Sequence, residues 1–207
     1  MSTVHVVESK AVGHWLGVLR DKKTPPALFR QAAELITQSV FQAASAEFEL
    51  ICEVRESPCG NFDWWRWKNP IALIPILRAG LGMVDPILEW VPDATILHLG
   101  AARDHDSLQP YFYYDKLPDS ISEQHCLVLD PMLATAGSAM ETIRRLKAKN
   151  ARKVTFLGLI GSRVGVENLA REFPEVKVYL GALDQTLNSN GYIVPGLGDA
   201  GDRYFFT

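Results

Sequence analysis

The residues best suited to chemistry lie in one stretch, Leu127–Ser138, where a single carboxylate ends an apolar run and a loop of small residues follows. The apolar run before Asp130 is typical of a buried strand, and a helical pattern begins at Gly137 or Ser138. Small side chains let the backbone approach an anion, and the free amides of a helix N-terminus attract phosphate. Thr135 and Ser138 can donate hydroxyl hydrogen bonds, while Asp130 can accept from two sugar hydroxyls. The pattern predicts a site for a phosphorylated sugar; a plain junction with Ser138 as helix N-cap is the structural alternative.

A second candidate lies at Arg78, which directly follows the apolar run Ile71–Leu77. Arginine supplies a permanent cation with a forked set of donors, and this geometry suits phosphate oxygens. Gly80 permits a backbone conformation that exposes amide groups nearby. The alternative is an arginine that caps a surface turn, and the buried strand before Arg78 makes that the weaker interpretation.

A third candidate, Arg103, lies in the polar segment Gly100–Pro110. Its neighbours Asp104, His105 and Asp106 invite interpretation as a metal site. Adjacent residues on a polar loop usually point in different directions, however, so a solvated loop is the favoured interpretation of this trio.

Alternating strands and helices should position these loops. Short apolar runs predict strands over residues 71–77, 95–101, 111–114, 124–130, 153–160 and 177–182. Helical periodicity predicts helices over residues 81–90, 137–149 and 164–173. This alternation is typical of an α/β fold, with a mostly parallel sheet flanked by helices. Ligands bind beyond the carboxyl ends of strands in such sheets, so the loops after Leu77, Ala101, Asp130 and Ala182 are the expected site.

The chain before this sheet predicts a helix and a hairpin. Thr24-Pro25-Pro26 opens a long helix, with Thr24 as the capping side chain and prolines in the first turn. Residues 48–67 predict a hairpin with its turn at residues 58–61. It carries Trp64, Trp65 and Trp67, for which packing on their own domain and contact between subunits are equal alternatives.

Composition restricts the class of protein. The 207 residues are 47% hydrophobic, and we expect a single domain over residues 1–207. A net charge of −3 argues against a dedicated nucleic-acid binder. Three cysteines without C-x-x-C spacing disfavour a disulfide framework and a zinc site. The first ten residues lack a signal peptide's apolar core, and no apolar run reaches the ~20 residues of a membrane span, so a cytoplasmic protein is expected.

The stretch from Asp130 to Ser138 resembles the phosphoribosyl-diphosphate (PRPP) motif of type I phosphoribosyltransferases. Most branches of that family carry two adjacent acids after the strand. This chain instead has Asp130-Pro131 followed by Met-Leu-Ala-Thr, a form similar to uracil phosphoribosyltransferases.

Three further stretches resemble the same family, and the resemblance covers nearly the whole chain. Pro75–Met83 resembles the diphosphate-binding loop, and Gly100–Pro110 the loop that carries a second diphosphate-binding arginine. Gly191–Arg203 resembles the uracil-binding C-terminal loop. Its glycines and Pro195 can fix a loop whose backbone groups read the O2, N3–H and O4 edge of a pyrimidine. A glycine-rich surface tail is the alternative on composition alone.

The resemblance implies a type I phosphoribosyltransferase fold, with an N-terminal helical segment, a hairpin arm and a small C-terminal base-binding hood. It implies transfer of the 5-phosphoribosyl group from PRPP to N1 of uracil, which gives UMP and diphosphate in pyrimidine salvage. The implied catalytic residues are Arg78, Arg103, Asp130 and Asp199. The implied PRPP-binding residues are these four with Pro131, Met132, Leu133, Ala134, Thr135, Ala136, Gly137 and Ser138. The implied uracil-binding residues are Tyr192, Ile193, Gly198, Asp199 and Ala200.

The resemblance also implies cofactors and partners. Mg²⁺ would be held mainly by PRPP, with Asp199 acting through a magnesium-bound water and no direct protein ligand. The family forms dimers or larger species, which implies a homo-oligomer, and GTP activates some of its members. No nucleic-acid or membrane partner is expected.

The chain departs from the family pattern both in the PRPP-like stretch and after the predicted strand 153–160. Ala136 stands where the family usually has glycine, and a positive φ there would cost about 1–2 kcal/mol. The stretch Ser162–Gly165 also differs from the usual form. Two alternatives to an enzyme remain: a PRPP- or nucleotide-binding regulatory protein on the same fold, and a catalytically weak sensor.

Overall fold

The computed structural model describes residues 4–103 and 110–207. Its first half contains β1 (Val4–Val6), α1 (Lys10–Arg20), α2 (Pro26–Ser45), β2 (Leu50–Ser57), β3 (Gly60–Trp67), β4 (Ile71–Leu77), the 3₁₀ helix η1 (Ala79–Met83), α3 (Val84–Leu88), β5 (Thr95–Ile96) and β6 (Leu99–Arg103). Its second half contains β7 (Pro110–Asp115), β8 (His125–Leu129), β9 (Met132–Leu133), α4 (Gly137–Ala148), β10 (Lys153–Ser162), α5 (Arg163–Glu172), β11 (Lys177–Asp184), β12 (Thr186–Leu187), β13 (Ile193–Val194) and α6 (Ala200–Phe205).

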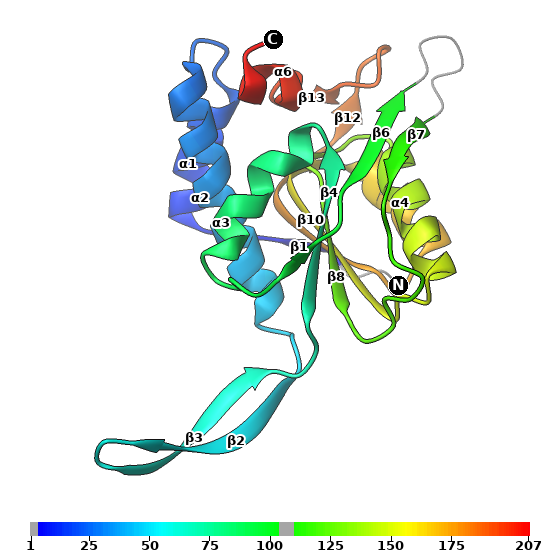
Figure 1. The fold of residues 1–207 in the computed structure, drawn as a ribbon. Helices are drawn as coiled ribbons and strands as arrows, with labels where there is room; N and C mark the ends of the chain where they lie inside the picture. Colours follow the sequence, from blue (N-terminus) through cyan, green and yellow to red (C-terminus); the bar gives the residue numbers. More distant parts are fainter. Residues whose placement is uncertain (1–3, 104–109) are drawn as a thin grey trace.

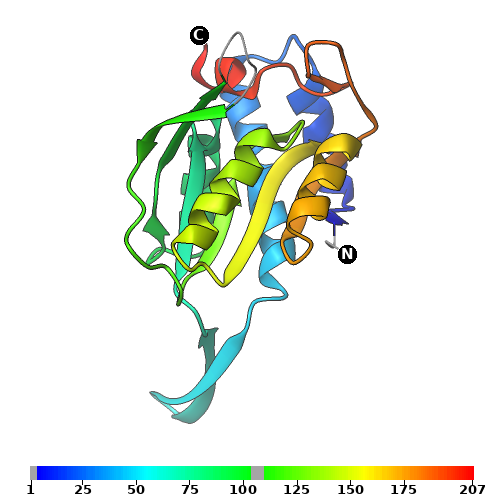
Figure 2. The same ribbon diagram turned by 90° about the vertical axis from the view of Figure 1, so that its right-hand side faces the viewer.

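The main sheet has the strand order β1-β11-β10-β8-β4-β6-β7, with β5 beside β4 and β9 beside β10. Its pairs are parallel except β6–β7, which confirms the predicted mostly parallel sheet. Helices α1 to α3 cover one face, and α4 and α5 cover the other (Figures 1 and 2). Each face has its own apolar core, one around Phe29, Ile36 and Phe41 and the other around Ile143, Leu146 and Phe156. The sheet is therefore buried on both sides.

Two predicted elements are broken, and in each case a proline removes a hydrogen bond that the unbroken element would need. The predicted strand 95–101 divides into β5 and β6. The amide of Leu97 donates to the carbonyl of Leu73 in β4 at 2.9 Å. In a regular parallel ladder the carbonyl of Leu97 would then accept from the amide of residue 75. That residue is Pro75, which has no amide hydrogen, so the ladder is interrupted at this point. The predicted helix 81–90 divides into η1 and α3, because Pro86 cannot donate to the carbonyl of Gly82.

The start of α2 also differs from the prediction. Its N-cap is Pro25, and no side chain caps the helix. The hydroxyl of Thr24 instead donates to the carbonyl of Val18 at 2.6 Å. Val18 lies in the last turn of α1, where helix carbonyls lack intrahelical partners, so Thr24 caps the preceding helix rather than the following one.

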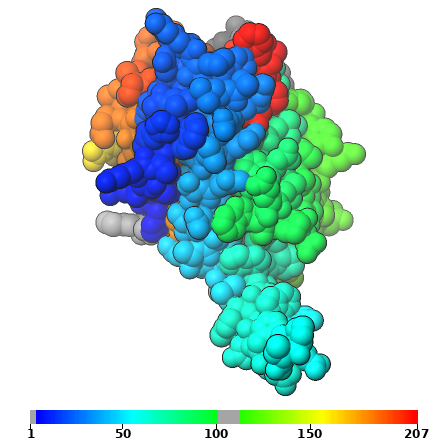
Figure 3. All heavy atoms as spheres, turned by 90° about the vertical axis from the view of Figure 1, so that its left-hand side faces the viewer, coloured from blue at the N-terminus to red at the C-terminus, as the bar shows by residue number. Residues whose placement is uncertain are grey.

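The hairpin β2–β3 projects from the body of the molecule (Figures 1 and 3). At its base Trp67 packs on Phe48, with ring centroids 5.6 Å apart. Farther out, Trp65 is 59% exposed and Val54 is 67% exposed. Packing of the whole hairpin on its own domain, one of the two alternatives above, is therefore not what the structure has.

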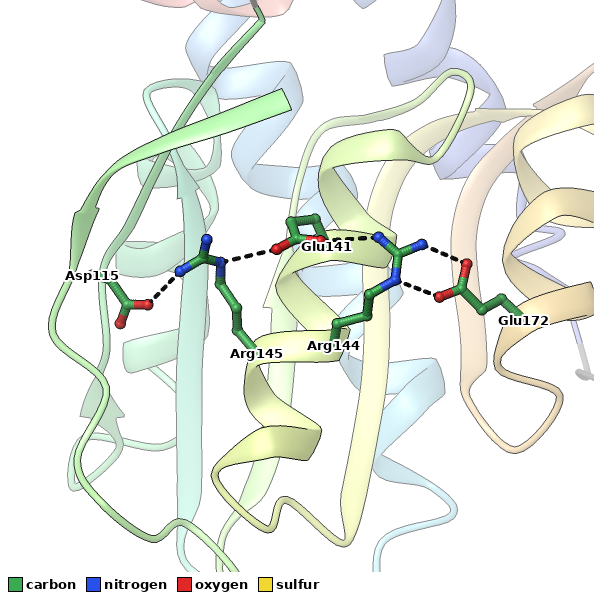
Figure 4. A network of polar contacts seen from close by, with 5 residues as sticks. All are labelled: Asp115, Glu141, Arg144, Arg145 and Glu172. Carbon is green, nitrogen blue, oxygen red and sulfur yellow. Dashed lines mark hydrogen bonds and ion pairs between the residues drawn. The ribbon is translucent and has the colours of Figure 1, made fainter. Parts of the chain in front are cut away.

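A chain of ion pairs ties β7, α4 and α5 together on the outer face (Figure 4). Arg145 pairs with Asp115 at 2.9 Å and with Glu141 at 3.3 Å. Glu141 also pairs with Arg144 at 2.9 Å, and Arg144 forms a two-pronged pair with Glu172 at 2.6 and 2.7 Å. Among the described helices, none combines the length and apolar character needed to cross a membrane.

Candidate active site

A cavity of about 440 Å³ opens at the carboxyl ends of the central strands. The loop after β8 and the first turn of α4 form one wall, and the segment before β13 forms the other. The lining residues are Asp130, Met132, Leu133, Ala134, Thr135, Ala136, Gly137, Ser138, Ala139, Asn190, Gly191, Tyr192, Ile193 and Asp199. The cavity therefore lies where the order of elements predicted a ligand.

The loop after β8 is held from beneath by β10. The amide of Asp130 donates to the carbonyl of Leu157 at 3.2 Å, and the carbonyl of Pro131 accepts from Leu159 and Ile160 at 3.0 Å each. These bonds continue the parallel register past the end of β8, so the loop leaves the sheet in a fixed direction. A small loop held in this way keeps its groups in place without a ligand.

The start of α5 supports the loop from outside. Ser162, which caps α5 by accepting from the amide of Gly165 at 2.9 Å, donates its hydroxyl to the carbonyl of Ala134. A Cβ on Gly165 would lie 2.4 Å from that same carbonyl, so glycine is required by the close approach. Asn168 donates to the carbonyl of Thr135 at 3.2 Å. Sequence reasoning noted Ser162–Gly165 only as a departure and missed this support, which a Ser capping signal before a helix could have indicated.

The first turn of α4 leaves backbone amides free beside the cavity. Ala136 is the N-cap, with φ 68° and ψ 6°, and no side chain caps the helix. The alternative with Ser138 as N-cap is therefore wrong. Ala136 does have a positive φ, which is the conformation that was expected to cost a residue with a Cβ about 1–2 kcal/mol. Because the first amides of a helix have no intrahelical acceptor, an uncapped N-terminus at a cavity suits an anion.

Asp130 carries an unusual proton affinity. Burial raises the pKa of its carboxyl to about 7, the nearby Asp199 carboxylate adds to the rise, and the amide of Met132 opposes it. Oδ1 of Asp130 accepts from that amide at 3.5 Å. A ligand that donates hydroxyl hydrogen bonds, or brings a cation, would favour the ionised form.

Asp199 reaches the cavity from the C-terminal segment. It is the N-cap of α6, and its Oδ1 accepts from the amide of Asp202 at 2.9 Å. Asp130 and Asp199 thus offer hard oxygen atoms from two different segments, a donor set that suits Mg²⁺. In residues 4–103 and 110–207, no group of three or more His, Cys, Asp or Glu residues is arranged as a metal site. Two carboxylates alone do not make up a metal site, so a magnesium ion here would be held mainly by the ligand that brings it.

The C-terminal segment forms the small hood that the sequence predicted. Strands β12 and β13 pair antiparallel, and a cis peptide bond joins Val194 to Pro195. Gly196 and Gly198 have φ of 59° and 82°, conformations that favour glycine. Tyr192 and Ile193 line the cavity, whereas Gly198 and Ala200 do not.

Arg78 lies outside the cavity lining. It follows a cis peptide bond at Leu77 and is the N-cap of η1. Its side chain is 56% exposed, with Nη2 3.4 Å from Asp202 Oδ1, and its guanidinium lies 5.9 Å from the ring centre of Phe205. Pro131 lines a separate small cavity beside η1. The side chain of Arg103, and all of Asp104, His105 and Asp106, lie outside the described residues.

The structure thus gathers most of the predicted residues at one cavity and leaves Arg78, Pro131, Gly198 and Ala200 at its margins. It adds two lining residues that sequence reasoning missed, Ala139 and Asn190. Ala139 belongs to the first turn of the predicted helix, and Asn190-Gly191 is a turn signal next to Tyr192, so both could have been found.

Comparison with known proteins gives the family. A family model described as uracil phosphoribosyltransferase matches residues 6–207. Curated proteins named uracil phosphoribosyltransferase are 45% identical in Roseiflexus sp. (strain RS-1) and 42% identical in Acholeplasma laidlawii, each over all of this chain and all of the relative.

Solved structures agree on the fold. The AQ2163 protein from Aquifex aeolicus superposes with a TM-score of 0.92 at 29% identity, over 98% of both chains. A hypoxanthine phosphoribosyltransferase from Staphylococcus aureus gives 0.52 at 11% identity over 76% of both chains, a likeness of fold alone. With a type I phosphoribosyltransferase fold and a family model that spans residues 6–207, the chain belongs to the uracil phosphoribosyltransferase family.

Proposed function

We propose that this protein transfers the 5-phosphoribosyl group from PRPP to N1 of uracil, giving UMP and diphosphate for pyrimidine salvage, as a single cytoplasmic domain of residues 1–207. The observation that carries the proposal is the shared cavity. It joins the uncapped N-terminus of α4, the carboxyl of Asp130 and the segment that precedes β13. A phosphate, a sugar and a base could lie along these three parts in that order.

The sugar phosphate would occupy the α4 side of the cavity. The amides of Gly137 and Ser138, with the hydroxyls of Thr135 and Ser138, would hold the 5′-phosphate. Asp130 would accept hydrogen bonds from the two ribose hydroxyls. Met132, Leu133, Ala134 and Ala136 would contribute the close-fitting backbone of this wall.

The leaving group would be bound from the opposite side. As the C1–O bond breaks, negative charge grows on diphosphate and positive charge on the sugar ring. Arg78 and Arg103 would stabilise the departing diphosphate. The guanidinium of Arg78 is well exposed, and its contacts with Asp202 and with the ring of Phe205 are long, so it can turn toward an anion. Magnesium, when bound with PRPP, supplies further positive charge to the diphosphate oxygens.

The base would be recognised by the hood. Main-chain groups of Ile193, Gly198 and Ala200 would read the uracil edge, with Tyr192 beside them, and Asp199 would act through water on the magnesium or on the ribose. Holding N1 of the base against C1 of the sugar is the main contribution expected from this loop. No side chain is assigned as a general base.

Two further properties belong to the proposal. The protein would form a homo-oligomer through its projecting hairpin, because a two-stranded hairpin with exposed apolar side chains is marginally stable by itself. GTP would act as an activator, and the assay below includes it for that reason.

The test measures UMP formation from labelled uracil, PRPP and Mg²⁺, with and without GTP. Cytosine, orotate and hypoxanthine serve as competing bases, and Asp130→Asn serves as the matched variant. We expect turnover that is selective for uracil and is largely lost in the variant. Absence of turnover in a protein that still binds PRPP or uracil would overturn the enzyme and favour the nucleotide-binding regulator.

A further inference from the structure

The end of α1 is joined to the loop between Ile193 and Asp199 by a partly buried ion pair. Arg20, the last residue of α1, donates from Nη2 to Asp184 Oδ1 and from Nη1 to Asp184 Oδ2, both at 2.7 Å. Asp184 ends β11 and is 7% exposed. This two-pronged geometry is the strongest form of the arginine–carboxylate pair, and the partial burial of the two side chains reduces its screening by salt.

The same two side chains hold both backbone polar groups of one residue in the loop, Gly196. Asp184 Oδ2 accepts from the amide of Gly196 at 3.0 Å, and Arg20 Nη1 donates to the carbonyl of Gly196 at 2.9 Å. The ion pair and Gly196 therefore form a closed arrangement in which a shift of any member breaks at least one bond. We call Arg20, Asp184 and Gly196 the loop clamp.

The loop clamp acts at the tightest point of the hood. Gly196 has φ 59°, and a Cβ there would lie 2.1 Å from the carbonyl of Ile193. The turn at Gly196 thus lies directly against Ile193, one of the proposed base-reading residues. Because Ile193 and Gly198 flank this turn, the position of Gly196 sets the spacing between them.

A second arginine fastens the other side of the same loop. Arg203 of α6 donates to the carbonyl of Leu197 at 2.8 Å and to the carbonyls of Leu19 and Asp21 at 2.5 and 2.6 Å. These last two carbonyls lie at the C-terminal end of α1, where helix carbonyls need outside donors and a cation is favoured. Both arginines thus connect the loop to the end of α1.

We propose that Arg20 and Asp184 are positioning residues for base selection: they act through Gly196 and set the spacing of the main-chain groups that read uracil. This inference rests on the proposed function for its consequence, although the clamp itself does not. The phosphate side of the cavity is supported separately, by β10 and α5. Loss of the clamp should therefore affect the base more than PRPP.

The test uses Arg20→Met, Arg20→Lys and Asp184→Asn in the full chain, with Arg144→Lys as control. Arg144 forms a similar two-pronged pair with Glu172 on α5, away from the loop. We expect Arg20→Met and Asp184→Asn to raise KM for uracil about tenfold or more while KM for PRPP stays within about threefold, since small misplacements have large effects. Arg20→Lys should retain part of the affinity for uracil, and the control should change neither KM.

Hydrogen exchange of residues 193–199 gives a readout that does not need turnover. We expect faster exchange of this segment in Arg20→Met than in the wild type or the control, because the amide of Gly196 loses its fixed acceptor geometry. Unchanged exchange, or an equal rise of both KM values, would overturn the inference. Should the wild type itself show no turnover, the proposed function fails and the exchange result alone decides whether the clamp fixes the loop. Should Arg20→Met not fold, Arg20→Lys and Asp184→Asn decide in the same way.

Discussion

Ala136 shows how backbone conformation and burial compete at a single residue. Its left-handed backbone costs a residue with a Cβ about 1–2 kcal/mol. Its methyl group is only 5% exposed, however, and such a group contributes roughly 0.8 kcal/mol through burial. Alanine also restricts the unfolded chain relative to glycine by about 0.4–1 kcal/mol. The strain and the two gains are similar in size.

We therefore expect Ala136→Gly to change the free energy of unfolding by less than about 1 kcal/mol, because the three effects nearly cancel. Ala139→Gly is the control: Ala139 is equally buried but lies inside α4, where glycine brings no relief. That change should lower the free energy of unfolding by about 1–2 kcal/mol. Urea unfolding of both variants measures the contrast, and equal losses would contradict the role of φ.

If Asp130 holds the ribose as proposed, we expect the binding of PRPP to depend on pH. Its carboxyl has a pKa of about 7 in the folded protein, mainly because it is buried. The ionised form accepts a hydrogen bond from a ribose hydroxyl at each of its two oxygens, whereas protonation turns one of these oxygens into a donor and weakens the other as an acceptor. As the pH falls below 7, the carboxyl takes up a proton and affinity for PRPP should weaken by up to about tenfold per pH unit.

The measurement is the Kd of PRPP between pH 5.5 and 8.5, compared between wild type and Asp130→Asn. PRPP has phosphate groups that titrate in this range, and their effect cancels in the comparison because both proteins bind the same ligand. We expect the ratio of the two Kd values to change through pH 7 and to level off above it. A ratio that is constant over the range would show that Asp130 keeps an ordinary pKa.

Residues whose role depends on local sequence could be predicted, and those whose role depends on distant partners could not. The loop from Asp130 to Ser138 was found because its strand, turn and helix signals are adjacent in the chain. Arg20 gave no such signal, since its partner Asp184 lies 164 residues away. The exposed position of Arg78 beside Asp202 likewise depends on how α6 packs.

At the scale of elements, periodicity located the sheet well because its strands are buried on both faces. Strand β4 has the predicted bounds, and β8, β10 and β11 differ from them by one or two residues. The failures at Pro75 and Pro86 arise because a missing amide breaks a ladder or helix without changing the apolar pattern. Contacts between elements, such as the ion pairs of Figure 4, could not be predicted, because they produce no periodic pattern in the sequence.

The ion pairs that join β7, α4 and α5 should make a small contribution that depends on salt. Glu141 is the shared carboxylate, so Glu141→Gln removes two pairs at once. We expect the free energy of unfolding to fall by about 1 kcal/mol at low salt, and by less in 1 M NaCl, because these partly exposed charges are screened.

The control is Glu167→Gln, which breaks an isolated and more exposed pair with Arg163. Its effect should stay below about 0.5 kcal/mol at either salt concentration. Urea unfolding at both concentrations measures the two variants. A loss in Glu141→Gln that does not depend on salt would point to packing rather than charge.

At the scale of the whole molecule, the body and the hairpin differ in how they are stabilised. The body has an apolar core on each face of its sheet, whereas the outer hairpin exposes Val54 and Trp65 to solvent. Composition and periodicity predicted both parts, but the direction in which the hairpin leaves the body is set by the few residues at its base. The sequence alone therefore could not decide whether the hairpin tryptophans pack on their own domain or contact another subunit.

We expect the wild type to form dimers or larger species and Trp65→Ser to weaken that association by about 30-fold or more, as for a central aromatic residue of an interface. Phe206→Ser removes an aromatic ring that is 78% exposed and lies off the hairpin, and it should leave association unchanged. Sedimentation velocity over a range of concentrations measures both. A monomeric wild type, or equal behaviour of the two variants, would contradict contact through the hairpin.

The contacts of Arg203 with Leu19 and Asp21 bear on the order in which parts of the fold can form while the chain is being synthesised. A chain is synthesised from its N-terminus, so α1 emerges long before the loop and helix that it holds. The wall proposed to hold the phosphate is built from segments that end with α5, whereas the hood needs α1 and residues 193–203 together. A nascent chain can thus complete the wall proposed for the sugar phosphate first, and the loop proposed to read the base only in the last step of its folding.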